Sequence, residues 1–286
     1  MTVLYHYCST SNFVAIVSSQ SIWLSSLSLS TDTMEGRLVS KIIDRLANRD
    51  GLTEQSINEI RSTVGFLEIL LDGLGFCLSL EGDLLSQWRG YAANATGFSI
   101  GFSKEYFLSL SERLTEKKDL VLFLQKVEYE VTEQEGLIRP TYENIKQIID
   151  SGRLKLPRPR GLLDQRSDGD IEKEFEEFKK SRMNFFTTTM KLIPKLYAIK
   201  TDAFREEKEW RLISHLLREK ESCLYRSLND RIVPYKIINL AKLEIEPIIE
   251  VKIGPKNKTP ISVVKNFLTM HGFTNVIVSQ SSATLR

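Results

Sequence analysis

Two glutamates and an arginine at alternate positions are the residues of this chain best suited by type and spacing to do chemistry. Glu207, Glu209 and Arg211 lie in the stretch FREEKEWRLI, where Trp210 and Leu212 alternate with them. Successive side chains of a β-strand point to opposite faces, so the two carboxylates and the guanidinium would share one face. Such a face is costly to bury and normal to expose. The pattern indicates either a solvated edge strand or a functional carboxylate pair with partners elsewhere in the chain.

His6 is the second candidate. It stands between Tyr5 and Tyr7 in LYHY, and in a strand its ring faces opposite to both tyrosines. A lone histidine is either a hydrogen-bonded core residue or a functional group. The other two histidines, His215 and His271, have no ligand-like spacing to it, so we expect no metal site at His6.

Two aromatic residues form the third candidate. Trp88 and Tyr91 lie one helical turn apart in QWRGYAANATGFSIG. A pair at this spacing is either a stripe facing the core or a surface on which a ligand stacks. The neighbouring Arg89 and the glycines are compatible with a turn that faces a ligand.

The missing motifs and the composition exclude several classes of protein. The sequence contains no GxSxG elbow, no P-loop and no GxGxxG, which removes the commonest hydrolase and nucleotide-binding motifs. Hydrophobic residues make up 42% and charged residues 27%, which is ordinary for a soluble globular protein, and a net charge of +2 gives no global attraction to nucleic acid. Three scattered cysteines form neither a disulfide framework nor a metal pattern. We therefore expect a reducing, cytoplasmic location, without a signal peptide and without a membrane span.

The hydrophobic periodicity predicts strands and helices in alternation. The expected strands cover residues 3–7, 22–25, 73–79, 96–102, 126–129, 195–200, 206–214, 232–240, 245–253 and 275–280. The expected helices cover residues 12–19, 38–46, 54–71, a short segment at 84–93, and 259–271, where Pro260 suits a first turn and Gly272 follows the end.

The character of the sequence changes at about residues 133–190. Polar residues dominate this segment, and its helical spacing predicts a mostly helical insertion into a single domain that spans residues 1–286. The insertion holds RLKLPRPRG, which two prolines keep from forming regular structure. Its basic residues either contact phosphate or belong to a solvated loop; they are Arg153, Lys155, Arg158 and Arg160.

A series of short motifs resembles a widespread bacterial family of domains of unknown function. Its members read roughly LYHY, ND-x-x-E, FS, W-x-x-Y-A, G-x-x-I-G-F and E-x-E-x-R. In this chain the matching motifs, in order, are LYHY at 4–7, IWLSS at 22–26, TDTMEG at 31–36, FCLS at 76–79, WRGYA, GFSIGF, FREEKEWRLI and IGP at 253–255. The chain departs from the family at Thr31, where asparagine is usual, and in its ending SSATLR.

The order of these motifs also has a more distant resemblance to the ADP-ribosyltransferase superfamily. That resemblance implies an α+β fold with a split mixed or antiparallel β core, flanking helices and a helical insertion. It implies that His6, beside Tyr7, orients NAD+ through its ribose, and that Glu209 is the late glutamate, preceded by Glu207. The resemblance also implies a middle residue beside the nicotinamide. The motifs leave three candidates for it: Tyr91, Trp88 or Ser25.

The chemistry of NAD+ suits this assignment. Breaking its N-glycosidic bond builds positive charge on the ribose, which a carboxylate at the 2′-hydroxyl stabilises. A second carboxylate accepts the proton of the incoming nucleophile. Two carboxylates on one strand face have Cα atoms about 7 Å apart, so each can serve one task. Arg211 either binds the pyrophosphate or holds a glutamate in an ion pair; we favour the ion pair because it explains why the cluster is tolerated.

The sequence therefore leads to one main functional hypothesis. The chain is expected to be an NAD-dependent ADP-ribosyltransferase, a transferase of the glycosyltransferase class that consumes NAD+ as a substrate. The resemblance implies a toxin or defence effector, as in toxin–antitoxin or antiviral systems, which modifies RNA, single-stranded DNA or a protein and has an antitoxin as a possible partner.

Two alternatives stay open. A non-catalytic module that binds nucleic acid or protein would carry the charged strand face on open surface, with His6 buried elsewhere. A metal-dependent nuclease would use Asp32, Glu35 and the glutamate pair, and it needs these carboxylates to converge.

Overall fold

A computed structural model describes residues 2–29, 37–116, 120–161, 164–217, 223–228, 230–240 and 242–283. It has helices and a single mixed sheet, which confirms the α+β class; the ADP-ribosyltransferase-like fold stays a prediction. The chain divides into two compact units. We call residues 1–33, 72–127 and 200–286 the sheet unit, and residues 34–71 and 128–199 the helical unit.

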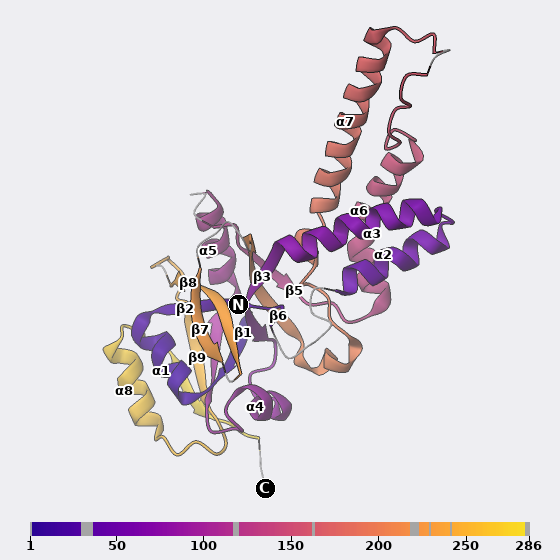
Figure 1. Cartoon of the computed structure of the whole chain (residues 1–286). Helices are drawn as coiled ribbons and strands as arrows, with labels where there is room; N and C mark the ends of the chain where they lie inside the picture. The colour runs from indigo at the N-terminus through magenta and orange to yellow at the C-terminus, as the bar shows by residue number, and fades with distance from the viewer. Residues whose placement is uncertain are drawn as a thin grey trace. The chain divides into compact units, whose positions relative to one another are not determined.

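The sheet unit has its strands in the order β10-β9-β4-β1-β3-β2-β8-β7, and β6 joins β5 to β3 (Figure 1). Only the β9–β10 pair is parallel among the pairs with a described register. The strands are β1 Val3–Cys8, β2 Ser21–Ser26, β3 Leu71–Ser79, β4 Phe98–Ser103, β5 Phe123–Lys126, β6 Glu209–Leu217, β7 Leu224–Leu228, β8 Arg231–Asn239, β9 Ile248–Ile253 and β10 Ile277–Gln280. The helices are α1 Thr10–Ser19, α4 Leu85–Tyr91, α5 Lys104–Glu116 and α8 Ile261–Met270, with a 3-10 helix η2 at Asp202–Glu207.

Strand β3 changes partners along its length. Its residue Ser79 pairs with Tyr5 of β1, whereas Leu74 and Gly75 pair with β2. Among the described registers, the residues between these two ladders have no partner on either β1 or β2; they are Phe76, Cys77 and Leu78. The central sheet parts at this point, and the candidate site lies there.

The main core lies on one face of the sheet. The Phe13 ring of α1 stacks on Phe98 of β4 at 4.1 Å and contacts Phe267 of α8 at 5.8 Å, so α1 and α8 lie side by side on this face. On β1, Leu4 and Cys8 belong to this core, while Tyr7 packs on the opposite side beside α4. The alternation predicted for LYHY is therefore confirmed.

Helix α1, expected at residues 12–19, begins two residues earlier, at Thr10, with Ser9 as its N-cap. The Ser9 hydroxyl accepts a hydrogen bond from the Asn12 amide at 3.2 Å, which satisfies one of the free donors of the first turn. Gln20 follows the helix in the left-handed conformation, with φ 48°, and the chain then enters β2. This short connection holds α1 against β2, where it forms one wall of the site.

The helical unit consists of α2 Leu38–Arg49, α3 Glu54–Leu70, α6 Val131–Asp150, α7 Asp168–Met190 and the short 3-10 helix η1 Ile193–Lys195. Apolar residues at helical spacing are buried on α2, α3 and α6. Ser167 caps α7 in a reciprocal capping box with Asp170. Helices α6 and α7 fall in the predicted insertion at residues 133–190, and the same unit also takes in residues 34–71.

Three local predictions need correction. Residues 195–200 form no strand; they follow η1 and contribute a single bridge between Ile199 and Glu128, because Pro194 favours the first turn of a helix. The strand expected at 206–214 begins only at Glu209. Helix α5 and strand β7 were not predicted.

Candidate functional site

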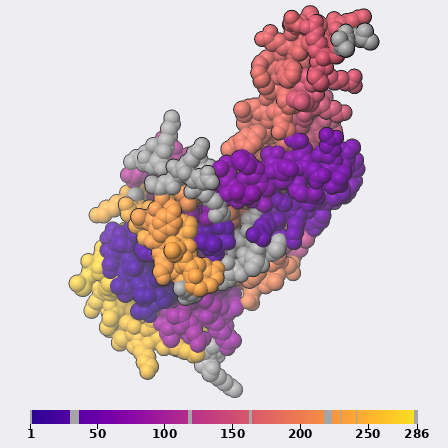
Figure 2. Space-filling model, viewed as in Figure 1, coloured from indigo at the N-terminus to yellow at the C-terminus, as the bar shows by residue number. Residues whose placement is uncertain are grey.

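A cavity of about 280 Å³ opens in the sheet unit where β1, β2 and β3 part. Helix α1 and strand β7 form its walls, and the side chains of β7 and β8 lie on the surface beside those of α1 (Figure 2). The polar and aromatic side chains that matter for binding come from five elements and are His6, Trp23, Ser25, Cys77, Tyr91 and Arg226.

His6 presents a neutral ring to this cavity. Its Nδ1 lies 2.9 Å from the carbonyl oxygen of Cys77, and since a carbonyl only accepts, Nδ1 carries the hydrogen. The ring also stacks on Phe76 at 4.1 Å. Burial lowers the pKa of His6 to about 4, although the bond to the Cys77 carbonyl acts in the opposite direction. At neutral pH, Nε2 is therefore a hydrogen-bond acceptor.

The glutamates and Arg211 form a buried charge cluster together with Lys200. The exposed fractions of Lys200, Glu207, Glu209 and Arg211 are 5%, 9%, 5% and 1%. Lys200 Nζ lies 2.6 Å from Glu207 Oε2 and 3.3 Å from Glu209 Oε2. Arg211 donates from Nε and Nη2 to the two oxygens of Glu209 at 2.7 and 2.9 Å. The solvated edge strand is therefore wrong, and the ion pair favoured for Arg211 is confirmed.

The cluster keeps Glu209 and Lys200 charged. Burial acts to raise the pKa of Glu209, but Arg211 and Lys200 outweigh it, so the pKa lies below its usual value. Burial likewise acts to lower the pKa of Lys200, and the two glutamates outweigh it and raise that pKa. Two carboxylates and two cations leave the cluster formally neutral, which explains how it is tolerated in the interior.

Glu207 reaches the cluster by a different route from the one predicted. It ends η2 rather than lying on β6, and Lys208 follows it with φ 43° in the left-handed region. Its carbonyl accepts from Ser79 Oγ at 2.7 Å, and the Lys208 carbonyl accepts from the Leu80 amide at 3.1 Å. Strand β3 thus fixes the turn that brings the Glu207 carboxylate to Lys200.

Tyr91 connects the cavity to the cluster. Its hydroxyl donates to Glu207 Oε1 at 2.9 Å, while the side chain lines the cavity and is 47% exposed. Burial of the hydroxyl and the negative charge of Glu207 raise its pKa, so the phenol stays protonated. Tyr91 is therefore a neutral donor between the solvent-accessible cavity and a buried carboxylate.

Cys77 is a second connection. Its carbonyl holds His6, and its thiol hydrogen-bonds to Glu209 while the side chain faces the cavity. His6 and Glu209 are thus joined through one residue of β3. A non-catalytic binding module would carry the charged side chains of Glu207, Glu209 and Arg211 on open surface, with His6 buried elsewhere. These three side chains are buried instead.

Arg226 supplies a cation that the sequence did not reveal. Its Nη2 donates to Ser25 Oγ at 3.1 Å, and its guanidinium lies 5.9 Å from the ring centroid of Trp23. Its Nε is buried and has no hydrogen-bond partner among the described residues. No carboxylate is among the described residues that line the cavity. Arg226 lies on the unpredicted β7, so no signal in the sequence linked it to Ser25.

The remaining predicted residues divide into two groups. Ser25 and Tyr91 line the cavity, whereas Trp88 and Tyr7 do not. The Trp88 side chain is fully buried, packs edge-on against Tyr7 at 4.9 Å, and donates from Nε1 to Asp83 at 2.7 Å. Trp88 and Tyr7 therefore belong to a satellite core and lie outside the cavity.

The metal-site hypothesis finds no carboxylate cluster in the part of the chain that the structure describes. No group of three or more histidine, cysteine, aspartate or glutamate side chains converges there as a metal site would require. Asp32 and Glu35, which the nuclease hypothesis uses, lie outside the described residues.

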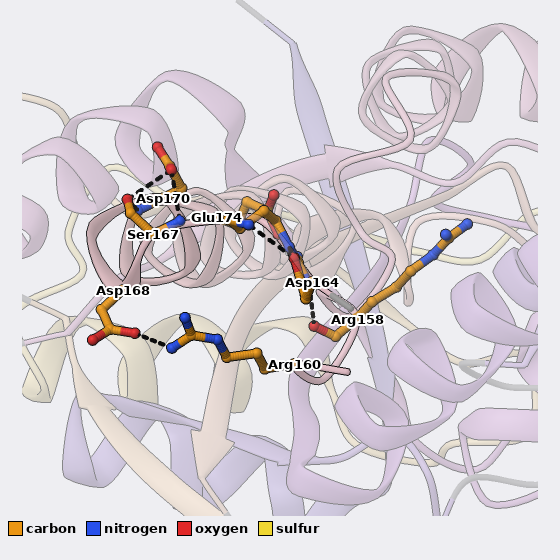
Figure 3. A network of polar contacts seen from close by, with 8 residues as sticks. Arg158, Arg160, Asp164, Ser167, Asp168, Asp170 and Glu174 are labelled. Carbon is orange, nitrogen blue, oxygen red and sulfur yellow. Dashed lines mark hydrogen bonds and ion pairs between the residues drawn. The ribbon is translucent and has the colours of Figure 1, made fainter. Parts of the chain in front are cut away.

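The basic segment of the insertion is partly neutralised. Arg160 pairs with Asp168, and Arg166 pairs with Asp164 and Glu174 in the network of Figure 3. Only the backbone carbonyl of Arg158 joins this network, and its side chain points away from it (Figure 3). Of the four basic residues, Arg160 is therefore neutralised by an ion pair, while the Arg158 side chain lies outside the network.

A family model described as "Protein of unknown function (DUF2971)" matches residues 87–212. This match confirms, over these residues, the resemblance to a family of domains of unknown function, and it does not show the resemblance to ADP-ribosyltransferases. No curated protein and no solved structure matches the chain. Within the described residues, none of the helices combines the length and the apolar content needed to cross a membrane.

Proposed function

We propose that this chain is an NAD-dependent ADP-ribosyltransferase-like enzyme that modifies a macromolecule. The observation that carries the proposal is the meeting of His6 and Tyr91 at one cavity, with Tyr91 donating to Glu207 at its edge. A first-strand histidine, a mid-chain aromatic residue and a late glutamate pair are the three parts that the resemblance requires, and they come from separate elements of the sheet unit.

The cavity suits one half of a dinucleotide. Its volume of about 280 Å³ lies near the lower end of the ~300–1,000 Å³ typical of ligand pockets, so it would take a nicotinamide riboside moiety with one attached phosphate. Arg226 and Ser25 offer donors to that phosphate. The His6 Nε2 accepts from a ribose hydroxyl, and the exposed face of Tyr91 offers a stacking surface.

The charge cluster supports the chemical step. The bond between ribose C1′ and the nicotinamide nitrogen breaks, its electron pair leaves with nicotinamide, and positive charge develops on the ribose. The thiol of Cys77 is a weak donor to Glu209, and a ribose hydroxyl is a stronger one. In the proposal the hydroxyl takes the place of the thiol, and the ionised Glu209 then stabilises the positive ribose. Glu207 accepts the proton of the attacking group through the Tyr91 hydroxyl.

Transfer of label from NAD+ carrying a labelled adenylate to a cell extract tests the proposal. The native protein is expected to transfer label, and Tyr91→Phe and His6→Ala are expected to lose at least tenfold in rate. Thermal melts serve as the folding control, because Tyr91→Phe removes one hydroxyl at the cavity edge. Label transfer that both variants retain at the native rate would refute the assignment, as would a native protein that neither binds NAD+ in calorimetry nor transfers label.

The proposed biological role is that of a toxin or defence effector with a neutralising antitoxin. Digestion of the labelled product with nuclease or with protease assigns the acceptor to nucleic acid or protein. Expression of the native chain is expected to arrest growth, and expression of Tyr91→Phe is expected to be tolerated. Equal growth of the two strains at equal protein levels would contradict this role.

A further inference from the structure

The helical unit contains a second concave surface, separate from the cavity of the sheet unit. It has a volume of about 400 Å³ and lies between α6 and α7. We call it the α6/α7 groove and define it by the residues that line it: Asn144, Gln147, Ile148, Ser151, Arg153, Ser181, Asn184, Thr188 and Lys191.

The lining follows one stripe on each helix. On α6 the positions 144, 147, 148 and 151 recur at helical spacing, and on α7 the positions 181, 184, 188 and 191 do the same. Stripes that face each other across two packed helices are normally apolar. Here Ile148 is the only aliphatic member, and the packing contacts of the pair come from neighbouring buried residues such as Ile145 and Phe185. The groove is therefore not a defect of packing but a polar surface.

The charge of the groove has one sign. Arg153 and Lys191 line it, and no carboxylate is among the described residues that do so. The nearest acids on α6, Glu143 and Asp150, lie outside the lining. Arg153 and Lys191 have no ion pair or side-chain hydrogen bond within the described chain, in contrast to the paired Arg160 and Arg166 at the far end of α7 (Figure 3).

The length of the groove indicates whether it suits a single anion or a polymer with repeated anionic groups. Its positions on α7 run from Ser181 to Lys191, which is about 15 Å at ~1.5 Å per residue. Arg153 follows Ser151 at the end of α6, where the lining of α7 begins, so the two cations stand at different points along the groove. A polymer with repeated phosphates can contact both cations at separate points, which suits the length of the groove.

The groups between the cations favour nucleic acid over an acidic peptide. Gln147, Ser181 and Asn184 make no side-chain hydrogen bond among the described residues, so their amides and hydroxyl are available as donors and acceptors. Protein interfaces depend on buried aromatic or aliphatic anchors, and among the described lining residues Ile148 alone is apolar, whereas nucleic-acid interfaces are polar and basic. Amide and hydroxyl groups can also bond base edges and the 2′-hydroxyl of ribose.

We propose that the α6/α7 groove binds the backbone of single-stranded RNA, with Arg153 and Lys191 on phosphates and the amides of Gln147 and Asn184 on sugar and base groups. The site stands without NAD+ chemistry. If the chain is the transferase proposed above, this groove makes RNA the acceptor of the transferred group, and that identification rests on the proposed function.

Fluorescence anisotropy of a short labelled single-stranded RNA, titrated with the full chain in the absence of NAD+, tests the proposal. The double variant Arg153→Gln, Lys191→Gln is expected to bind about tenfold more weakly at physiological salt. Its plot of log affinity against log salt is expected to be shallower by about 1.4, since each phosphate contact on a single strand contributes ~0.7. Asn184→Ala is expected to weaken binding without changing this slope.

A matched control uses two exposed lysines of α7 outside the groove. The double variant Lys173→Gln, Lys180→Gln removes the same charge from the same unit and is expected to keep most of the affinity. An equal loss of RNA affinity in both double variants would show that the effect comes from net charge alone and would overturn the proposal that RNA binds in the α6/α7 groove. So would an unchanged slope in the groove variant, tighter binding of duplex DNA than of RNA, or competition by polyglutamate as effective as by RNA. Loss of NAD+ transfer with RNA binding intact would count against the proposed function alone.

Discussion

Replacing Arg211 by methionine is expected to destabilise the sheet unit strongly. Arg211 is 1% exposed and makes two hydrogen bonds to Glu209, which is itself 5% exposed. Removing one partner of a buried ion pair leaves the other charge uncompensated, at a cost of about 3–5 kcal/mol. Lys200 lies 3.3 Å from the same carboxylate and partly compensates, so we expect a value near the lower end, about 3 kcal/mol.

Arg205→Met is a matched control from the same stretch of chain. Arg205 also pairs with a carboxylate, Asp202, but the two side chains are 54% and 66% exposed. Exposed pairs contribute about 0–1 kcal/mol, so this variant is expected to unfold almost as the native protein does. The two variants make the same chemical change and differ only in the burial of the pair.

Urea unfolding followed by tryptophan fluorescence is the appropriate assay. The three tryptophans, Trp23, Trp88 and Trp210, all belong to the sheet unit, so the signal reports that unit. A loss of about 3 kcal/mol corresponds to a fall in Tm of about 10 °C. A free energy of unfolding of Arg211→Met within about 1 kcal/mol of that of Arg205→Met would show that the charge cluster is solvated, and would refute the expected cost of breaking a buried ion pair.

Three further outcomes are expected. The pKa of His6 is about 4 in the folded chain and 6.5 in the unfolded chain. Between these two pH values the unfolded chain binds more protons than the folded chain. The contribution of His6 to the free energy of unfolding is therefore complete above pH ~6.5 and falls as the pH drops toward 4. This loss is about 3 kcal/mol at pH 4, and pH-dependent unfolding of His6→Phe should lack it. Cys77 is exposed and Cys8 is buried, so iodoacetamide should alkylate Cys77 before Cys8, as measured by peptide mass spectrometry. This modification should also abolish NAD+ binding in calorimetry. Native affinity after full modification of Cys77 would contradict the binding of NAD+ in this cavity. Ser167→Ala removes the capping box of α7 and should cost about 1 kcal/mol, visible as lower helicity by circular dichroism on heating, whereas Ser62→Ala, in the interior of α3, should cost less.

The sequence predicted most of what depends on local period. The strand at LYHY, helix α1 and the opposite orientation of His6 and its neighbouring tyrosines follow from alternation and helical spacing, and the structure has all of them. These features are decided within about ten residues of chain, where short-range sterics and hydrogen bonds dominate.

The charge cluster could be predicted only in part. The sequence brought Glu209 and Arg211 together because they are two residues apart on one strand. Lys200 was missed because it precedes the strand, in a segment that resembles a strand but follows a 3-10 turn at Pro194. Glu207 reaches the same lysine through a left-handed Lys208, and such a residue is not encoded by a distinctive local pattern.

The cavity could not be predicted at all, because it arises from sheet topology. Arg226 meets Ser25 only because β7 pairs with β8 and β8 with β2, and the pairing of β8 with β2 spans about two hundred positions of sequence. Trp88 shows the converse limit. Its spacing from Tyr91 is the same on a core helix and on a ligand-facing one, and tertiary packing alone decides that Tyr91 faces the cavity and Trp88 the interior.

The change of ladder partners along β3 affects how the site can vary among homologous sequences. The orientation and the tautomer of His6 depend on the backbone carbonyl of Cys77, which every amino acid at that position would supply. The cysteine side chain is therefore free to change with little effect on the imidazole, while its contact with Glu209 changes with it. Substitution at position 77 can thus alter what the cavity admits and how the carboxylate is shielded, independently of the histidine that stands opposite.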